Sequence, residues 1–92
     1  MKKESKILIK EDLLIDLEFE LNNINLTDKE EEEKSYCFIL TKLEEWSTCG
    51  DDSISKEQLW CLANYLQDST GTLSDCYMSM ISMIETGNYS MS

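Results

Sequence analysis

The chain has 92 residues, of which 41% are hydrophobic and 29% charged, so one modest core is expected rather than a disordered polar tract. Nineteen Asp and Glu against eight Lys give a net charge of −11, and the chain contains no Arg and no His. Such a surface repels nucleic acids and anionic membranes and attracts basic proteins. Without His or Arg, the usual general base and phosphate clamp are missing. We therefore expect a single-domain, non-catalytic binding protein that needs no metal or cofactor.

The charge is distributed unevenly along the chain. Residues 1–10 contain four of the eight Lys, whereas residues 11–92 hold eighteen acids and four Lys, a net charge of −14. The apolar residues near the start are interrupted by Lys6, Lys10, Glu11 and Asp12. This pattern fits neither a signal peptide nor a membrane span, so we expect a cytoplasmic protein.

A first helix is predicted over about residues 6–24, with two apolar stripes at helical spacing. The main stripe consists of Ile7, Leu13, Leu14, Leu17, Leu21 and Ile24. Leu8, Ile15 and Phe19 form a second stripe on the roughly opposite side. A helix with two such stripes is either central in its bundle or keeps one stripe for a partner, and we expect central burial.

Three acidic residues form a row on the same helix. Asp12, Asp16 and Glu20 follow one another at a spacing of four residues, where like charges destabilise a helix by a few tenths of a kcal/mol per pair. No Lys intervenes between them in the sequence. The row is either a solvated face or a binding face, and periodicity alone does not decide between the two.

A second helix is predicted over about residues 28–48. Thr27 and Glu30 match a capping box, and the acidic run 30–33 then favours the positive end of the helix dipole. Part of this acidity is therefore structural, although Glu31 and Glu33 remain candidates for partner binding. The expected core face consists of Tyr36, Ile39, Leu40, Leu43 and Trp46.

A third helix over about 55–69 and a fourth over about 73–86 complete the prediction. Ser55 and Gln58 form a second capping box, with Ile54 and Leu59 as its hydrophobic staple. The core positions of these helices are Leu59, Leu62, Ala63, Leu66, Leu73, Cys76, Tyr77, Met80, Ile81, Met83 and Ile84. Each of the three Gly follows a helix, where a left-handed cap residue is common, and residues 88–92 look like a frayed tail. Short connections favour an all-α, compact four-helix bundle or a close variant.

The four cysteines and one loop are the candidate metal ligands of the chain. Cys37, Cys49, Cys61 and Cys76 contain no C-x-x-C pair, so we expect free thiols, buried or half-buried, rather than zinc ligands. Residues 47–59 resemble the second half of an EF-hand loop and the start of its exit helix. Asp51 is the only side-chain ligand of the expected type, so the loop is interpreted as a capped connection without calcium.

Two hypotheses for function remain. The first is an inhibitor from a phage or mobile element that occupies a basic nucleic-acid-binding site on a host defence enzyme by mimicking DNA or RNA. The chain resembles phage-encoded inhibitors of restriction and CRISPR systems in size and charge. The alternative is a small helical adaptor or immunity-type regulator that binds through the second stripe, or forms a homodimer through it. The candidate partner-binding residues are Asp12, Asp16, Glu20, Glu31, Glu33, Phe19 and Ile15.

Overall fold

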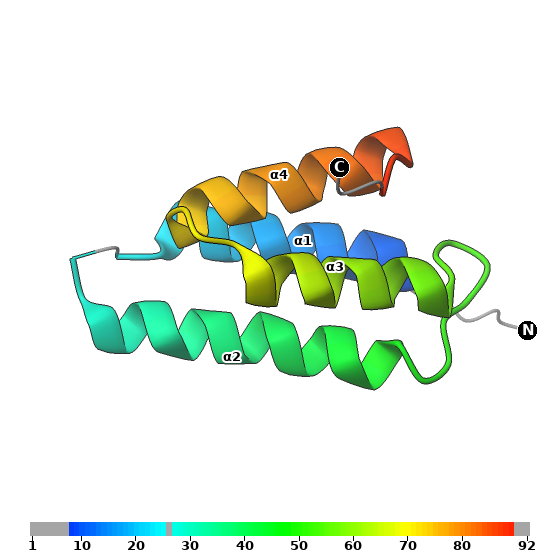
Figure 1. Cartoon of the computed structure of the whole chain (residues 1–92), viewed down its shortest axis with the longest axis horizontal. Coiled ribbons are helices and arrows are strands. Elements are labelled where there is room, and N and C mark those ends of the chain that lie inside the picture. Colours follow the sequence, from blue (N-terminus) through cyan, green and yellow to red (C-terminus); the bar gives the residue numbers. More distant parts are fainter. Residues whose placement is uncertain (1–7, 26, 90–92) are drawn as a thin grey trace, which may run out of the picture.

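The computed structural model describes residues 8–25 and 27–89, and it confirms the prediction of an all-α four-helix bundle. The helices are α1 (Ile9–Asn23), α2 (Lys29–Trp46), α3 (Lys56–Asp68) and α4 (Leu73–Thr86). Successive helices run in opposite directions, as short connections favour (Figure 1). The described residues contain no strand.

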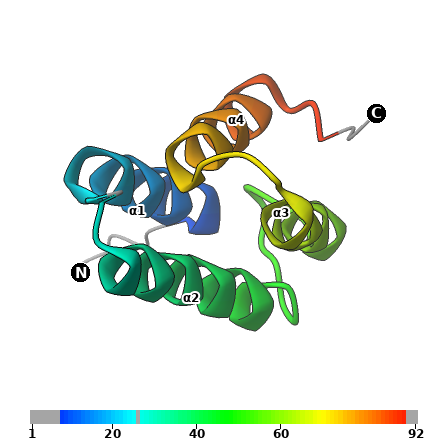
Figure 2. The ribbon, with the colours of Figure 1, turned by 60° about the vertical axis from the view of Figure 1, so that its left-hand side comes forward.

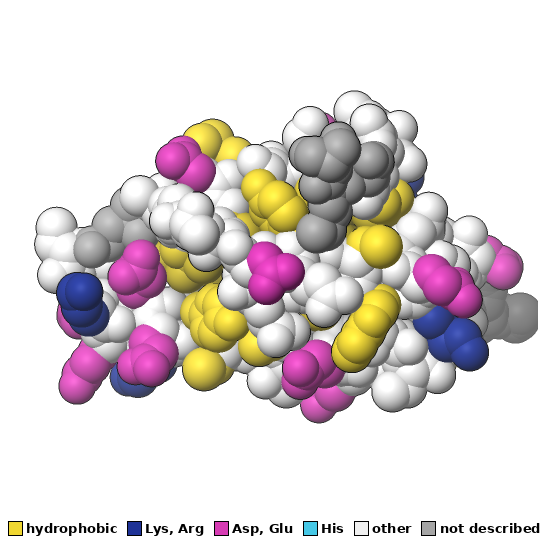
Figure 3. Space-filling model, in the orientation of Figure 1, with side chains coloured by type: hydrophobic (Ala, Val, Ile, Leu, Met, Phe, Trp, Pro, Cys, Tyr) yellow, Lys and Arg dark blue, Asp and Glu magenta, His cyan; other side chains and the backbone are white. Residues whose placement is uncertain are grey.

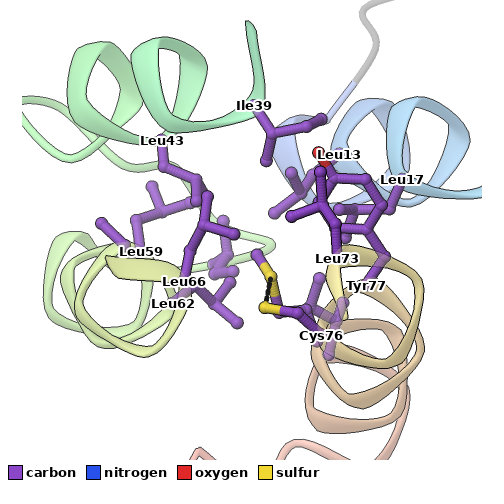
Figure 4. Close-up of a cluster of buried hydrophobic side chains, with 14 residues drawn as sticks. Leu13, Leu17, Ile39, Leu43, Leu59, Leu62, Leu66, Leu73, Cys76 and Tyr77 are labelled. Carbon is purple, nitrogen blue, oxygen red and sulfur yellow. Dashed lines mark hydrogen bonds between the residues drawn. The ribbon is translucent and has the colours of Figure 1, made fainter. Parts of the chain in front are cut away.

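The helices pack as two close pairs. The most extensive contacts join α2 to α3 and α1 to α4, and a smaller contact joins α1 to α2 (Figure 2). Leucines of α2 and α3 gather on one side of the core, and Leu13, Leu17 and Tyr77 of α1 and α4 gather on the other (Figure 4). The thiol of Cys76 donates to Met80 Sδ at 3.8 Å between these groups. Polarizable sulfur atoms therefore fill the junction of the two pairs.

The helix starts follow local capping signals with one correction. Ser55 and Gln58 form the predicted capping box of α3, with both of its hydrogen bonds present. The predicted cap of α2 at Thr27 is wrong, because Asp28 Oδ1 accepts from the N–H of Glu30 instead, at 3.0 Å. Thr27 stands one residue before the cap, and its hydroxyl and N–H both donate to Asn25 Oδ1.

The start of α1 is capped by a distant loop. Asp51 Oδ2 accepts from the N–H of Ile9 at 2.8 Å, and Ser53 Oγ accepts from the N–H of Lys10 at 3.0 Å. The other carboxylate oxygen of Asp51 accepts from the N–H groups of Ser53 and Ile54. The hydrogen bond from Ile9, followed by those from Ser53 and Ile54, lowers the pKa of Asp51 to about 2. The stretch that resembles half of an EF-hand thus uses its Asp to anchor a helix.

Two of the three glycines have the expected left-handed conformation. Gly50 and Gly87 have φ of 61° and 73°, but Gly71 has no positive φ, so the prediction of a left-handed cap there is wrong. The chain leaves α3 through Ser69 in an extended conformation, which requires no glycine. The tail also differs from expectation, because Tyr89 packs against the core; residues 90–92 lie outside the described part.

Candidate surface between α1 and α2

Helix α1 buries only one of its two apolar stripes. Leu13 and Leu17 are fully buried, whereas Ile15 and Phe19 are each 60% exposed. The expectation that α1 is central and buried on both sides is therefore wrong. The physical reason is that the main helix contacts of α1 are with α4 and α2, which leaves its outer side uncovered. Of the rest of the second stripe, Leu8 is half-buried.

The acidic row of α1 receives a cation from α2. The Nζ of Lys42 donates to Asp16 Oδ2 at 2.8 Å, with 30% of the Lys42 side chain and 19% of the Asp16 side chain exposed. The hydrogen bond to Asp16 is the largest effect and raises the pKa of Lys42. Burial opposes it, and the charges of Asp16, Asp12 and Glu45 add smaller increases. Lys42 therefore reduces the charge repulsion at the centre of the acidic row. The spacing of residues within α1 alone does not reveal this contact.

Lys42 also contacts aromatic side chains of its own helix. Its Nζ lies 4.9 Å from the ring centroid of Phe38 and 5.4 Å from that of Trp46, within the range of cation–π attraction. Phe38 is 42% exposed. Lys42 thus connects the carboxylate of Asp16 to the aromatic edge of α2, and these contacts hold its side chain in one place.

Two hollows flank Phe38. One of about 300 Å³ lies between the helices and is lined by Glu20, Glu31, Lys34, Ser35 and Phe38. The other, of about 750 Å³, follows the outer side of α2 and is lined by residues that include Glu33, Cys37, Phe38 and Glu45. Glu20 and Glu31 therefore face the same hollow, whereas Glu33 is absent from it and lines the outer one.

We define the α1–α2 face by eight residues from these two helices: Ile15, Phe19 and Phe38, with Asp12, Asp16, Glu20, Glu31 and Lys42. Residues three or four apart are neighbours on a helix, so Phe19 adjoins both Ile15 and Asp16. The acidic row and the second apolar stripe, which the sequence presented as alternative binding surfaces, thus lie side by side. Sequence reasoning missed Lys42, although Phe38 and Lys42 are four residues apart on one edge of α2.

Among the residues that the structure describes, no helix other than α1 exposes two large hydrophobic side chains. Trp60 on α3 and Met78 on α4 are also exposed, by 54% and 51%, but each is the only large exposed hydrophobic residue on its own helix. On the side that shows α3 in front, acidic side chains are scattered among hydrophobic and neutral ones (Figure 3). Acidity is therefore general, and the α1–α2 face is distinguished by its apolar neighbours.

The cysteines are more exposed than predicted. Cys37 and Cys49 are exposed, Cys61 is half-buried, and Cys76 is buried, where desolvation raises the pKa of its thiol. Cys37 is exposed because it lies on the outer side of α2, away from the core. Over residues 8–25 and 27–89, no three Cys, Asp or Glu side chains lie close enough to hold a metal ion.

Comparisons with protein-family models, with curated proteins and with solved structures found no match to this chain. Within the part that the structure describes, no helix is both long and apolar enough to cross a membrane.

Proposed function

We propose that this is a non-catalytic binding protein whose α1–α2 face docks on a basic patch of a partner protein. The observation that carries the proposal is the exposure of Ile15 and Phe19, which lie one helical turn apart and are each 60% exposed. Large apolar side chains that adjoin on a surface are typical of interaction sites. Aromatic residues of this kind contribute much of the binding energy when a partner covers them.

The charge around Ile15 and Phe19 determines which kind of partner can bind. Helix α1, Ile9–Asn23, carries five acidic residues and Lys10 as its one cation. A basic partner gains from these carboxylates through faster encounter and better orientation, because complementary charge steers association. Two copies of this chain would instead place acidic helices against each other, which disfavours a homodimer through the same face.

A second candidate function is supported by the acidic row itself. Within the described residues, the one ion pair joins Lys42 to Asp16, so the carboxylates of Asp12 and Glu20, one turn before and one turn after Asp16, form no ion pair. Two carboxylates that lie two turns apart on one helix can occupy a basic groove of a partner. There they supply part of the negative charge that a nucleic-acid backbone would supply. We propose as this second candidate an inhibitor that occupies a nucleic-acid-binding site, such as that of a host defence enzyme.

The two candidates are separated by paired variants in a capture experiment from host lysate. Docking through apolar anchors predicts that the double variant I15A/F19A loses the captured protein, while W60A/M78A retains it. Charge mimicry predicts that D12K/E20K loses it, and that capture by the unmodified chain falls steeply as salt rises. If I15A/F19A captures the same proteins in the same amounts, docking through these anchors is wrong.

A further inference from the structure

We infer that the segment bound by the α1–α2 face is a basic amphipathic helix, lying lengthwise between α1 and α2. The inference rests on the proposed function and goes further, because it names the form and chemistry of the partner segment. The two helices run antiparallel (Figure 1) and contact each other, and residues of both helices line the hollow of about 300 Å³.

Each of the two helices exposes an aromatic side chain near the hollow, and Phe38 is the one that lines it. Phe19 lies on the exposed edge of α1, next to Asp16, and Phe38 lies on the facing edge of α2, next to Lys42. The 2.8 Å ion pair between Asp16 and Lys42 joins the two edges. A segment that covers the ion pair can therefore contact an aromatic ring on each side. One apolar stripe along a helix supplies contacts of this kind.

The charge of the α1–α2 face determines which residues must flank the apolar stripe of the partner helix. Lys42 is already paired, so the face offers the carboxylates of Asp12 and Glu20 on α1 and of Glu31 on α2, with Lys34 at one end of the hollow. These carboxylates border the apolar contacts rather than replace them. The complementary segment has Lys or Arg on both sides of an apolar stripe.

A helix fits this surface better than an extended segment does. Extended peptides gain affinity by adding a strand to a sheet edge, and the described residues contain no strand. Two adjacent helices, in contrast, form a groove into which a third helix packs at the usual distance of about 8–10 Å between axes. A second copy of this chain does not have the charge that the α1–α2 face requires of a partner. None of its described helices combines a basic face with an apolar stripe.

The test uses synthetic peptides of about 18 residues, or five helical turns, and the full chain in calorimetric titrations. The first peptide places Leu in one stripe flanked by Lys, the second has the same composition scrambled, and the third replaces each Lys by Glu. We expect the first peptide to bind at least about tenfold more tightly than the scrambled one, and the Glu peptide not to bind.

Variants of the chain then locate the peptide. We expect I15A/F19A and F38A each to weaken the amphipathic Lys peptide by about tenfold, and W60A/M78A to leave its affinity unchanged within about twofold. All these side chains are at least 42% exposed, so circular dichroism should show an unchanged fold. The F38A variant is the most informative, because a helix that lies between α1 and α2 must contact side chains of both helices.

The possible results separate the inference from the proposed function. If the scrambled peptide binds equally well, or F38A has no effect while I15A/F19A does, the groove-bound helix is wrong and docking through α1 stands. If the amphipathic Lys peptide does not bind, the inference is also wrong. If only W60A/M78A weakens binding, the α1–α2 face is not the binding surface and both proposals fail.

Discussion

Lys42 and Asp16 are 26 residues apart in the chain, and the 2.8 Å hydrogen bond between their side chains joins α2 to the acidic row of α1. The pair changes the meaning of that row. In the sequence, Asp12, Asp16 and Glu20 form an uninterrupted row of negative charges. In the folded protein, Lys42 neutralises Asp16, so the row has one carboxylate on each side of a neutral pair. It also positions Lys42 against the ring of Phe38, so that acidic and apolar groups occupy one surface.

The first prediction concerns the free energy of this pair. In a double-mutant cycle of D16N and K42M, we expect a coupling free energy of about 0.5–1 kcal/mol, as for partly exposed ion pairs, from urea unfolding at low salt. The raised pKa of Lys42 means that its contribution is complete below the ordinary lysine pKa and is lost in strongly alkaline solution. A coupling that is zero, or that does not decrease with added salt, would contradict this assignment.

The second prediction concerns the capping of α1 by Asp51. Because the folded-state pKa of Asp51 is lowered to about 2, its stabilising contribution is present above the ordinary Asp pKa and is lost as pH falls toward 2. We expect D51N to be less stable than the wild type at neutral pH, and the difference to shrink between about pH 4 and pH 2. The exposed neighbour Asp52 provides the control, and D52N should keep the wild-type dependence on pH.

The third prediction compares the glycines. Gly50 has φ of +61°, and a Cβ there would lie 2.9 Å from the backbone nitrogen of Lys56, so G50A should destabilise the protein by about 1–3 kcal/mol. Gly71 has open space around it and no positive φ, so G71A should be neutral or stabilising by up to about 1 kcal/mol. Thermal unfolding of the two variants checks the order. Equal melting temperatures would show that the conformation at Gly50 is not required.

The fourth prediction concerns the buried polar pair of the core. Ser35 Oγ and Tyr77 OH lie 2.8 Å apart, and Tyr77 is fully buried, which raises the pKa of its phenol. We expect Y77F and S35A each to cost about 1–3 kcal/mol, because each leaves a buried hydroxyl without its partner. The double variant should cost less than the sum of the two. Additive losses in the cycle would mean that the hydroxyls do not interact.

The sequence was sufficient for those features that neighbouring residues determine. The four helices follow from periodicity, and the capping box of α3 follows from Ser55 and Gln58, three residues apart. The pairs Asp51–Ile9 and Ser35–Tyr77, each 42 residues apart, exist only once helices pack, so no local pattern indicates them.

The candidate surface was predictable in part for the same reason. Spacing placed Ile15 and Phe19 on one stripe of α1 and Asp12, Asp16 and Glu20 in one row. Periodicity identifies a stripe, but the packing of neighbouring helices decides whether it is covered. The central burial expected for α1 was therefore wrong, and the contribution of Lys42 from α2 was missed.

The central claim is that the α1–α2 face binds the partner, and site-specific photo-crosslinking tests it most directly. A photoreactive amino acid replaces Phe19 in one variant and Trp60 in a matched control, since both side chains are more than half exposed. After irradiation in cells that express the protein, we expect a discrete protein adduct from position 19 that is absent from position 60. An adduct from position 60 with none from position 19 would contradict it.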